Sequence, residues 1–177
     1  MKSTNLAYGS TAKTIHWISA LLIFILFGSG FFSGSNDSQA LKTLALQVHV
    51  PVASLVLILT IVRLVWWWKF DRKPAPLDTV PDWQNKAAKL VHKLLYLLLF
   101  VLLGSGITMS IISGLPLALF GDAALPIFDD LPPRTAHGLA ARLAIAVVLF
   151  HAVAALHHHF IVKDNTLKRM WFSAKKR

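Results

Sequence analysis

Four long runs without a charged residue constrain this chain more than any other feature. Each run has 18 to 20 residues: Ile15–Phe32, Thr43–Val62, Leu94–Ile112 and Leu143–Val162. An α-helix needs about 20 apolar residues to cross roughly 30 Å of hydrocarbon, and this length favours helix over buried strand. The sequence therefore predicts an all-α integral membrane protein, a four-helix bundle that forms a single domain over residues 1–177.

The helices are expected at residues 13–33, 43–68, 83–112 and 135–162. Asp82 in "VPDWQNKAAKL" resembles an N-cap, so the third helix is expected to begin before its uncharged run. The preceding segment "KPAPLDTVP" is Pro-rich and predicts a connector without helix. Between the third and fourth helices, residues 113–134 contain four prolines and three aspartates, which predicts an ordered loop. The tryptophans at 66–68 and 171 fit an aromatic belt at the membrane interface.

The basic residues indicate how the chain crosses the membrane. The formal net charge is +10, and 15 of the 18 Lys and Arg residues flank the two ends of the chain or the middle connector. Lys42, Arg134 and Arg142 are left for the opposite side. The positive-inside rule therefore predicts that both termini and the middle connector lie in the cytoplasm. Contact with anionic lipid explains most of this charge, and nucleic acid is not an expected partner.

The histidines carry the functional signal. The chain has no cysteine, which excludes disulfides, thiolate metal sites and iron–sulfur ligation. His16 opens the first helix on the cytoplasmic side, and His49 lies near the outer start of the second. His137 lies at the outer start of the fourth helix, and His151 follows 14 residues later. Because 14 residues make about 21 Å of rise and close to four whole turns, these two share one face at opposite depths.

Each of these two depths has a partner histidine on another helix. His49 matches His137 on the outer side, and His16 matches His151 on the inner side. Two neutral imidazoles facing each other across a bundle are what a six-coordinate haem iron requires. The alternative for a single membrane histidine is a hydrogen bond to a neighbouring helix, but four at two matched depths favour ligation.

Several glycines lie along the same helices. They would allow close helix contact or leave room for a flat macrocycle, although ordinary small-residue packing explains any one of them equally well. They are Gly28, Gly30, Gly104, Gly106 and Gly138.

Arg63 lies 14 residues after His49 and therefore shares its face at the cytoplasmic level. Its planar guanidinium suits the propionates of an inner haem. The alternative is a topology-setting charge at a helix end.

The motifs "IHW", "VHV", "AHG" and "FHAVAALHHHF", followed by "KDNTLKRM", resemble the bacterial cytochrome b561 family over nearly the whole chain. The resemblance implies a four-helix protein of the bacterial inner membrane with two b-type haems. It also implies oxidation of superoxide at the periplasmic face and reduction of ubiquinone near the cytoplasmic face. Related b-type subunits serve hydrogenases and formate dehydrogenases.

Carried over by position, the resemblance implies His16 and His151 as axial ligands of the inner haem, and His49 and His137 as ligands of the outer one. It places His158 where the family has a histidine close to the quinone. His157 matches no position of the motif, and the loop at residues 113–134 diverges from the family.

Together with this resemblance, the residue types at the cytoplasmic end of the fourth helix predict a quinone site there. His158 and His159 lie at the membrane surface, where an imidazole can hydrogen-bond a carbonyl and deliver a proton near neutral pH. Lys163 could supply a further donor. The alternative is a solvated histidine cluster without a role.

Two basic residues predict that the outer side attracts a small anion. Arg134 precedes His137 by three residues, and Lys42 precedes His49 by seven. Local positive potential raises the capture rate of an anion such as superoxide. Asp129 and Asp130 work against this, and in the alternative interpretation Arg134 neutralises them or binds lipid headgroups.

We therefore expect an oxidoreductase of the superoxide:ubiquinone type, with superoxide or another periplasmic compound as electron donor. The alternative is a cytochrome b relay or anchor subunit of a larger respiratory oxidoreductase. A divalent-metal transporter, suggested by "HHH", would need intramembrane carboxylates. The chain has no Glu, and no Asp lies in an uncharged run.

Overall fold

The structure is a computed structural model that describes residues 2–121 and 123–172, and all of its regular elements there are helices. Lys175, Lys176 and Arg177, which contributed to the charge argument, lie outside the described residues. Four helices are long and apolar enough to cross a membrane. They are α1 (Ser10–Ser35), α2 (Gln39–Val65), α3 (Asp82–Ile112) and α5 (Pro132–His157). The predicted all-α fold with four membrane-length helices is confirmed.

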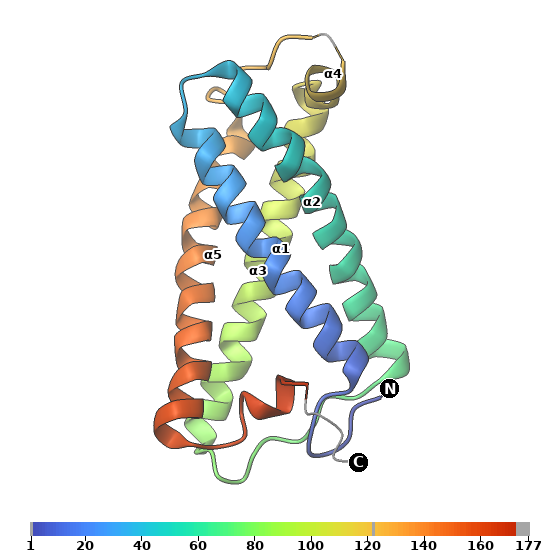
Figure 1. Cartoon of the computed structure of the whole chain (residues 1–177), viewed down its shortest axis with the longest axis vertical. Coiled ribbons are helices and arrows are strands. Elements are labelled where there is room, and N and C mark those ends of the chain that lie inside the picture. Colours follow the sequence, from blue (N-terminus) through green and yellow to red (C-terminus); the bar gives the residue numbers. More distant parts are fainter. Residues whose placement is uncertain (1, 122, 173–177) are drawn as a thin grey trace.

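Shorter helical segments continue or connect these four. A π-helix, η1 (Trp66–Phe70), extends α2, and a second, η2 (His158–Val162), extends α5. Between α3 and α5 lies α4 (Leu115–Phe120), and a 3₁₀ turn, η3 (Lys168–Met170), follows η2. Figure 1 shows the blue segment before α1 and the red segment after α5 at one end of the bundle, here called the terminal end, and α4 at the other, the α4 end. The assignment of the terminal end to the cytoplasm stays a prediction.

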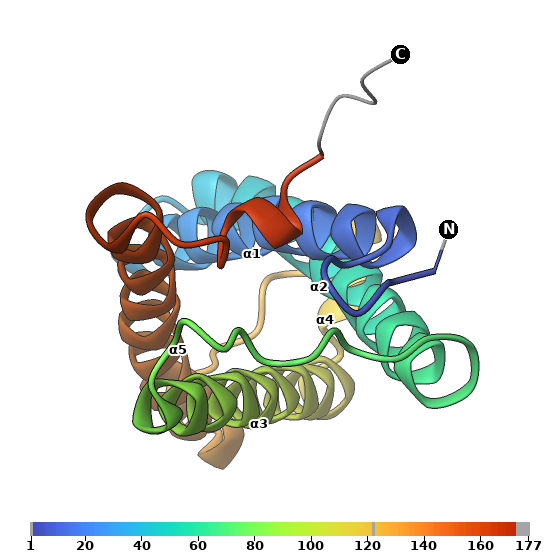
Figure 2. The same cartoon turned by 90° about the horizontal axis from the view of Figure 1, so that it is seen from below.

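The bundle is formed by two closely packed helix pairs, α1 with α2 and α3 with α5. Figure 2, a view from the terminal end, shows the four long helices surrounding a common interior. Between α3 and α5, Leu98 packs against Ala140 and Ala144, whose small side chains allow the helices to approach. Large apolar side chains such as Phe24 and Phe150 are exposed, as expected for surfaces that contact lipid.

The helix ends correct one prediction from the sequence. Helix α3 begins at Asp82 itself, and its N-cap is Pro81 with no side-chain cap hydrogen bond, so the assignment of Asp82 as N-cap was wrong. A proline fixes the backbone φ before the helix, and the carboxylate in the first turn complements the helix dipole. At the other end, Gly114 adopts a left-handed φ of 65° and turns the chain into α4. Gln47 of α2 then holds α4, because its Nε2 donates to the carbonyl of Leu119 at 2.7 Å.

Asp71 ties the N-terminal segment to the terminal end of α2. This carboxylate is 9% exposed. It accepts hydrogen bonds from the backbone and hydroxyl of Ser3, from Nε1 of Trp66 and from the backbone of Arg72. Burial by itself would raise the pKa of Asp71, but these hydrogen bonds outweigh burial and lower the pKa below its usual value. Asp71 is therefore ionised and holds Ser3 in place.

Arg169 ties the C-terminal segment to the same end. Its Nε donates to the carbonyl of Leu6 at 2.8 Å, and its Nη2 donates to the carbonyl of Ala75 at 2.7 Å. The indole of Trp17 in α1 donates to the carbonyl of Met170 at 2.9 Å. Three segments far apart in sequence are thus joined into one cap across the terminal end.

The tryptophans at this end divide into two groups. Trp68 and Trp171 are 78% and 58% exposed, which fits the expected aromatic belt. Trp66 and Trp67 instead face the protein: Trp66 bonds Asp71, and the Trp67 ring packs edge-on against Tyr8 with centres 5.9 Å apart. Half of the expected belt therefore belongs to the cap.

We expect Asp71→Asn to lower the free energy of unfolding at neutral pH by about 1.5–3 kcal/mol, the range for hydrogen bonds to a charged group. Because the folded-state pKa of Asp71 lies below the unfolded value of about 3.9, the advantage of Asp over Asn is complete above about pH 4. It is lost as pH falls through the folded pKa. Thermal unfolding in detergent over a pH series measures this, with the exposed Asp78→Asn as control. Equal stability of wild type and Asp71→Asn at pH 7 contradicts the prediction.

Candidate functional site

Two pairs of histidines face each other inside the bundle, one near each end. At the α4 end, His49 of α2 faces His137 of α5 with ring centres 6.3 Å apart and ring planes at 65°. Towards the terminal end, His16 of α1 faces His151 of α5 with ring centres 6.4 Å apart and planes at 75°. The structure therefore brings together the residues that the depth argument paired.

The separation of the rings distinguishes coordination from a direct hydrogen bond. Imidazole nitrogens bind a metal ion at about 2 Å, so two axial imidazoles have ring centres about 6 Å apart. A direct hydrogen bond between ring nitrogens, at about 3 Å, would bring the centres to about 5 Å. The observed 6.3 and 6.4 Å match the axial arrangement at both levels. The residues present thus fit two six-coordinate haem irons.

Two of the five glycines noted in the sequence allow close approach to these rings. A Cβ on Gly30 would lie 3.1 Å from Cε1 of His49, and a Cβ on Gly106 would lie 3.5 Å from Cε1 of His137. A Cβ on Gly138 would lie 3.6 Å from Nη1 of Arg134. A Cβ on Gly28 or Gly104 would have no atom of a neighbouring helix within 4 Å, so helix packing does not require glycine at these two positions.

The inner pair is accompanied by a third imidazole and by unpaired donors. His92 of α3 lies edge-on to His151 with ring centres 5.2 Å apart. The guanidinium of Arg63 lies over the ring of Tyr96 at 5.8 Å. Nε of Arg63 and Nε1 of Trp67 are buried and have no hydrogen-bond partner. Because an unpaired buried donor costs about 1–3 kcal/mol, two of them on adjacent turns of α2–η1 are suited to an anionic partner such as a haem propionate.

At the α4 end the outer pair opens into a cavity of about 560 Å³, whose lining includes His49, His137, Lys42 and Arg134. This volume lies within the usual range for ligand sites. A Cβ on Gly34 would lie 3.9 Å from Nη2 of Arg134, so the guanidinium lies against the end of α1.

Among the residues that the structure describes, Arg134 forms no ion pair with the nearby aspartates, although Asp129 lines the same cavity. Within residues 2–121 and 123–172 the structure shows an ion pair between His158 and Asp164 and none from Arg134 to Asp129 or Asp130. The direct ion pair in which Arg134 would neutralise those aspartates is therefore not formed in this structure.

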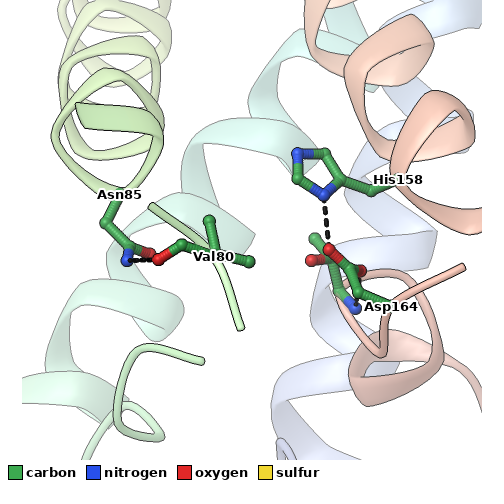
Figure 3. A network of polar contacts seen from close by, with 5 residues as sticks. Val80, Asn85, His158 and Asp164 are labelled. Carbon is green, nitrogen blue, oxygen red and sulfur yellow. Dashed lines mark hydrogen bonds and ion pairs between the residues drawn. The ribbon is translucent and has the colours of Figure 1, made fainter. Parts of the chain in front are cut away.

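A histidine–aspartate pair lies at the terminal end of α5. Nδ1 of His158 lies 2.5 Å from Oδ2 of Asp164, and the two side chains are 17% and 6% exposed. Figure 3 shows the ring of His158 directed at this carboxylate, with its second nitrogen turned away. Burial alone would raise the pKa of Asp164, but hydrogen bonds from Thr166 and His158 outweigh it and lower the pKa. The carboxylate is therefore ionised, and Nδ1 of His158 is the donor.

A strained turn brings Asp164 back to His158. Lys163 adopts a left-handed φ of 60°, which is uncommon for a residue other than glycine. The turn lets the backbone N–H of Asp164 donate to the carbonyl of His158 at 3.2 Å. Backbone strain of this kind concentrates at functional sites. Near this turn, Nδ1 of His159 is buried without a hydrogen-bond partner, while the side chain of Lys163 is exposed.

Sequence reasoning gave no role at these sites to five residues. They are His92, Trp67, which was assigned to the aromatic belt, Asp164, and the two serines Ser29 and Ser105, which hydrogen-bond the outer histidines. The serines had a signal in the sequence, because both occur in the tripeptide Gly-Ser-Gly. Only the glycines of that tripeptide were considered. Asp164 lies beyond the end of the helix, where helical spacing carries no information.

Comparison with known proteins adds an independent observation. A family model described as prokaryotic cytochrome b561 matches residues 7–173. The chain is 30% identical to cytochrome b561 homolog 2 of Escherichia coli, over 92% of this chain and 90% of that protein. It is 28% identical to cytochrome b561 homolog 1 of the same species, over 92% and 96%. It is also 28% identical to a probable superoxide oxidase, CybB, of Yersinia pestis, over 88% and 90%.

Proposed function

The chain belongs to the prokaryotic cytochrome b561 family, and on this premise we propose that it is a dihaem enzyme that oxidises superoxide and reduces ubiquinone. Family membership makes it a multi-pass bacterial membrane protein of electron transfer that uses b-type haem. The observation that supports the finer proposal best is the presence of two imidazole pairs with axial spacing, one near each end of the bundle.

The residues divide between two haem sites. His49 and His137 would hold the outer haem b, and His16 and His151 the inner one. Arg63 and Trp67 would hydrogen-bond the propionates of the inner haem, which provides their buried donors with partners. When bound, haem supplies one-electron transfer, while the chain supplies the axial ligands, burial and nearby charge.

The chemistry at the α4 end requires little from the protein. Each superoxide anion loses one electron and leaves as O₂, so no proton moves and no bond to the protein forms. Attraction and access are therefore the main requirements. Arg134 and Lys42 line the cavity that contains the outer histidines, together with one carboxylate, Asp129. The two basic side chains outnumber this carboxylate, and their positive charge would raise the local concentration of an anion.

The terminal end must supply protons as well as electrons. Reduction of one ubiquinone to ubiquinol takes up two electrons, from two superoxide anions, and two protons. His158 is suited to hydrogen-bond a quinone carbonyl and deliver a proton through Nε2, because Asp164 occupies its Nδ1. His159 and Lys163 would supply further donors to the same quinone. With the terminal end in the cytoplasm, as the positive-inside rule predicts, these protons come from the cytoplasm.

The proposal is tested by anaerobic rapid mixing of the purified protein with superoxide. A reduced-minus-oxidised spectrum should first show b-type haem at two equivalents per chain. Superoxide should then reduce the haem rapidly, and added ubiquinone should reoxidise it. Haem that superoxide leaves oxidised, while dithionite reduces it, contradicts the proposed donor but leaves the family assignment intact.

Replacing Arg134 and Lys42 together by alanine should slow capture of superoxide by about tenfold at low salt, the lower range for electrostatic steering. Added salt should slow superoxide capture by the wild type towards the rate of the double variant, because mobile ions screen exposed charges over about 10 Å at 0.1 M. The measurement is the second-order rate of haem reduction as a function of ionic strength. Arg142→Ala removes a basic residue of α5 that does not line the cavity and serves as the control. Identical salt dependence in wild type and double variant contradicts steering.

A second function, a relay subunit of a larger oxidoreductase, is favoured by a different observation. Helix α4 and the loop after it expose three large apolar side chains, Leu117, Phe120 and Ile127. Such side chains suit contact with a protein partner as well as with lipid. Slow reduction by superoxide, together with rapid reduction by a protein that co-purifies with this chain, would favour the relay.

A further inference from the structure

We infer that Ser29 and Ser105 are positioning residues that fix the tautomer and raise the basicity of the two outer haem ligands. The inference rests on the proposed function, because it takes His49 and His137 to be those ligands. The two serines lie in separate helices and occupy the middle of the same tripeptide, Gly28–Gly30 in α1 and Gly104–Gly106 in α3.

Each serine contacts the histidine of the neighbouring helix through the same ring atom. Oγ of Ser29 lies 3.0 Å from Nδ1 of His49, and Oγ of Ser105 lies 2.9 Å from Nδ1 of His137. The contacts run from α1 to α2 and from α3 to α5, the two closely packed helix pairs. All four long helices therefore contribute to one level of the bundle. The same contact between a serine and a histidine occurs in both helix pairs of the outer site.

The hydroxyl protons decide the direction of these two hydrogen bonds. A serine hydroxyl has one proton to donate. Ser29 donates to the carbonyl of Ile25 at 2.8 Å, and Ser105 donates to the carbonyl of Val101 at 2.6 Å. Since the proton is used within the helix, each Oγ accepts a hydrogen bond from the histidine ring. Nδ1 therefore carries the proton in both rings.

The direction of these two hydrogen bonds decides which ring nitrogen is left free. In a neutral imidazole that donates through Nδ1, Nε2 has the free lone pair. Both histidines are thus prepared to present Nε2 to an iron.

The glycine after each serine makes this contact possible. The backbone at Gly30 and Gly106 lies so close to the ring that a Cβ would be 3.1 and 3.5 Å from Cε1 of the histidine. Serine holds one edge of the imidazole while glycine leaves room for its face. The tripeptide therefore acts as a unit.

A hydrogen-bond acceptor on Nδ1–H raises the basicity of a ligating imidazole, and such partners also affect metal affinity by about 10–100-fold. A more basic ligand stabilises the ferric over the ferrous state. We therefore expect Ser29→Ala or Ser105→Ala to increase the ferrous-to-ferric ratio of the outer haem at a given potential by up to about tenfold, which equals about 59 mV for one electron. Loss of the outer haem should also accelerate by about tenfold or more.

The test is a spectroelectrochemical titration of the purified holoprotein, together with the rate of haem transfer to an excess of apomyoglobin. The inner haem, at the other level, serves as internal reference. Ser54→Ala is the matched control, because Ser54 lines the same cavity and donates to the carbonyl of Val50, four residues earlier, as Ser29 and Ser105 do towards Ile25 and Val101. Ser29→Thr and Ser105→Thr retain the hydroxyl and should keep the wild-type potential and haem retention.

An outer-haem potential and a transfer rate that do not change in either alanine variant overturn the inference, as does an equal change in Ser54→Ala. If an alanine variant does not assemble with haem, the threonine variant at the same position decides. An outer haem with wild-type properties in that variant supports the role of the hydroxyl, whereas loss of the outer haem contradicts it. These outcomes are separate from those of the proposed function, because they require neither superoxide nor quinone. A protein whose outer haem survives His49→Ala would instead contradict the assignment of the ligands.

Discussion

His49→Ala or His137→Ala is expected to yield a protein with one haem b in place of two. Each substitution removes one of two imidazoles whose ring centres lie 6.3 Å apart, and alanine has no atom that can coordinate iron. The inner pair lies about 21 Å further along α5 and should keep its haem. The reciprocal variants, His16→Ala and His151→Ala, should lose the inner haem and keep the outer one.

Haem per chain from pyridine haemochromogen spectra, combined with redox titration, distinguishes these outcomes. His157→Ala is the control, because His157 lies on the same helix as two of the ligands, is exposed and matches no ligand position. Two full equivalents of haem in His49→Ala or His137→Ala would falsify the assignment of the outer ligands. His92→Ala extends the test to the third imidazole near His151 and should retain both haems.

His158→Ala is expected to slow reoxidation of the reduced haems by ubiquinone by about a hundredfold, the low end of the contribution of a positioned acid or base. Haem content should not change, because His158 belongs to neither imidazole pair. The physical reason is the arrangement around the ring: an ionised carboxylate holds Nδ1 and leaves Nε2 for the quinone. The measurement is stopped-flow reoxidation of dithionite-reduced protein over a range of quinone concentrations.

Asp164→Asn distinguishes two contributions of Asp164: orienting the ring of His158, and stabilising the protonated form of His158 by its charge. An asparagine in place of Asp164 would still form the turn, but it has no charge to stabilise a protonated His158. We expect reoxidation intermediate between wild type and His158→Ala, with the quinone concentration at half-maximal rate changed less than the maximal rate. His157→Ala again serves as the control. Reoxidation at the wild-type rate in His158→Ala would exclude its proposed role.

The helices and their approximate depths could be predicted from the sequence because both depend on local properties. In lipid, the backbone N–H and C=O groups of a run of 18 to 20 uncharged residues must find their hydrogen-bond partners within one helix. The length of the run then fixes how far the helix spans the membrane. The helical period then fixes which residues share a face, as it did for His137 and His151. The prediction failed at helix ends, where Asp82 lies inside α3 and half of the expected tryptophan belt packs in the cap.

The environment of each histidine was decided by tertiary structure alone. Ser29 and His49 are 20 residues apart, whereas Ser105 and His137 are 32 apart, so no single spacing in the sequence could relate them. Their contacts depend on how each helix is rotated about its own axis against its neighbour. The same holds for Arg63 and Trp67, whose buried donors become visible only when the faces of α2 and η1 are known. Asp164 reaches His158 through a left-handed turn at Lys163, a backbone state that a lysine adopts only when its surroundings impose it.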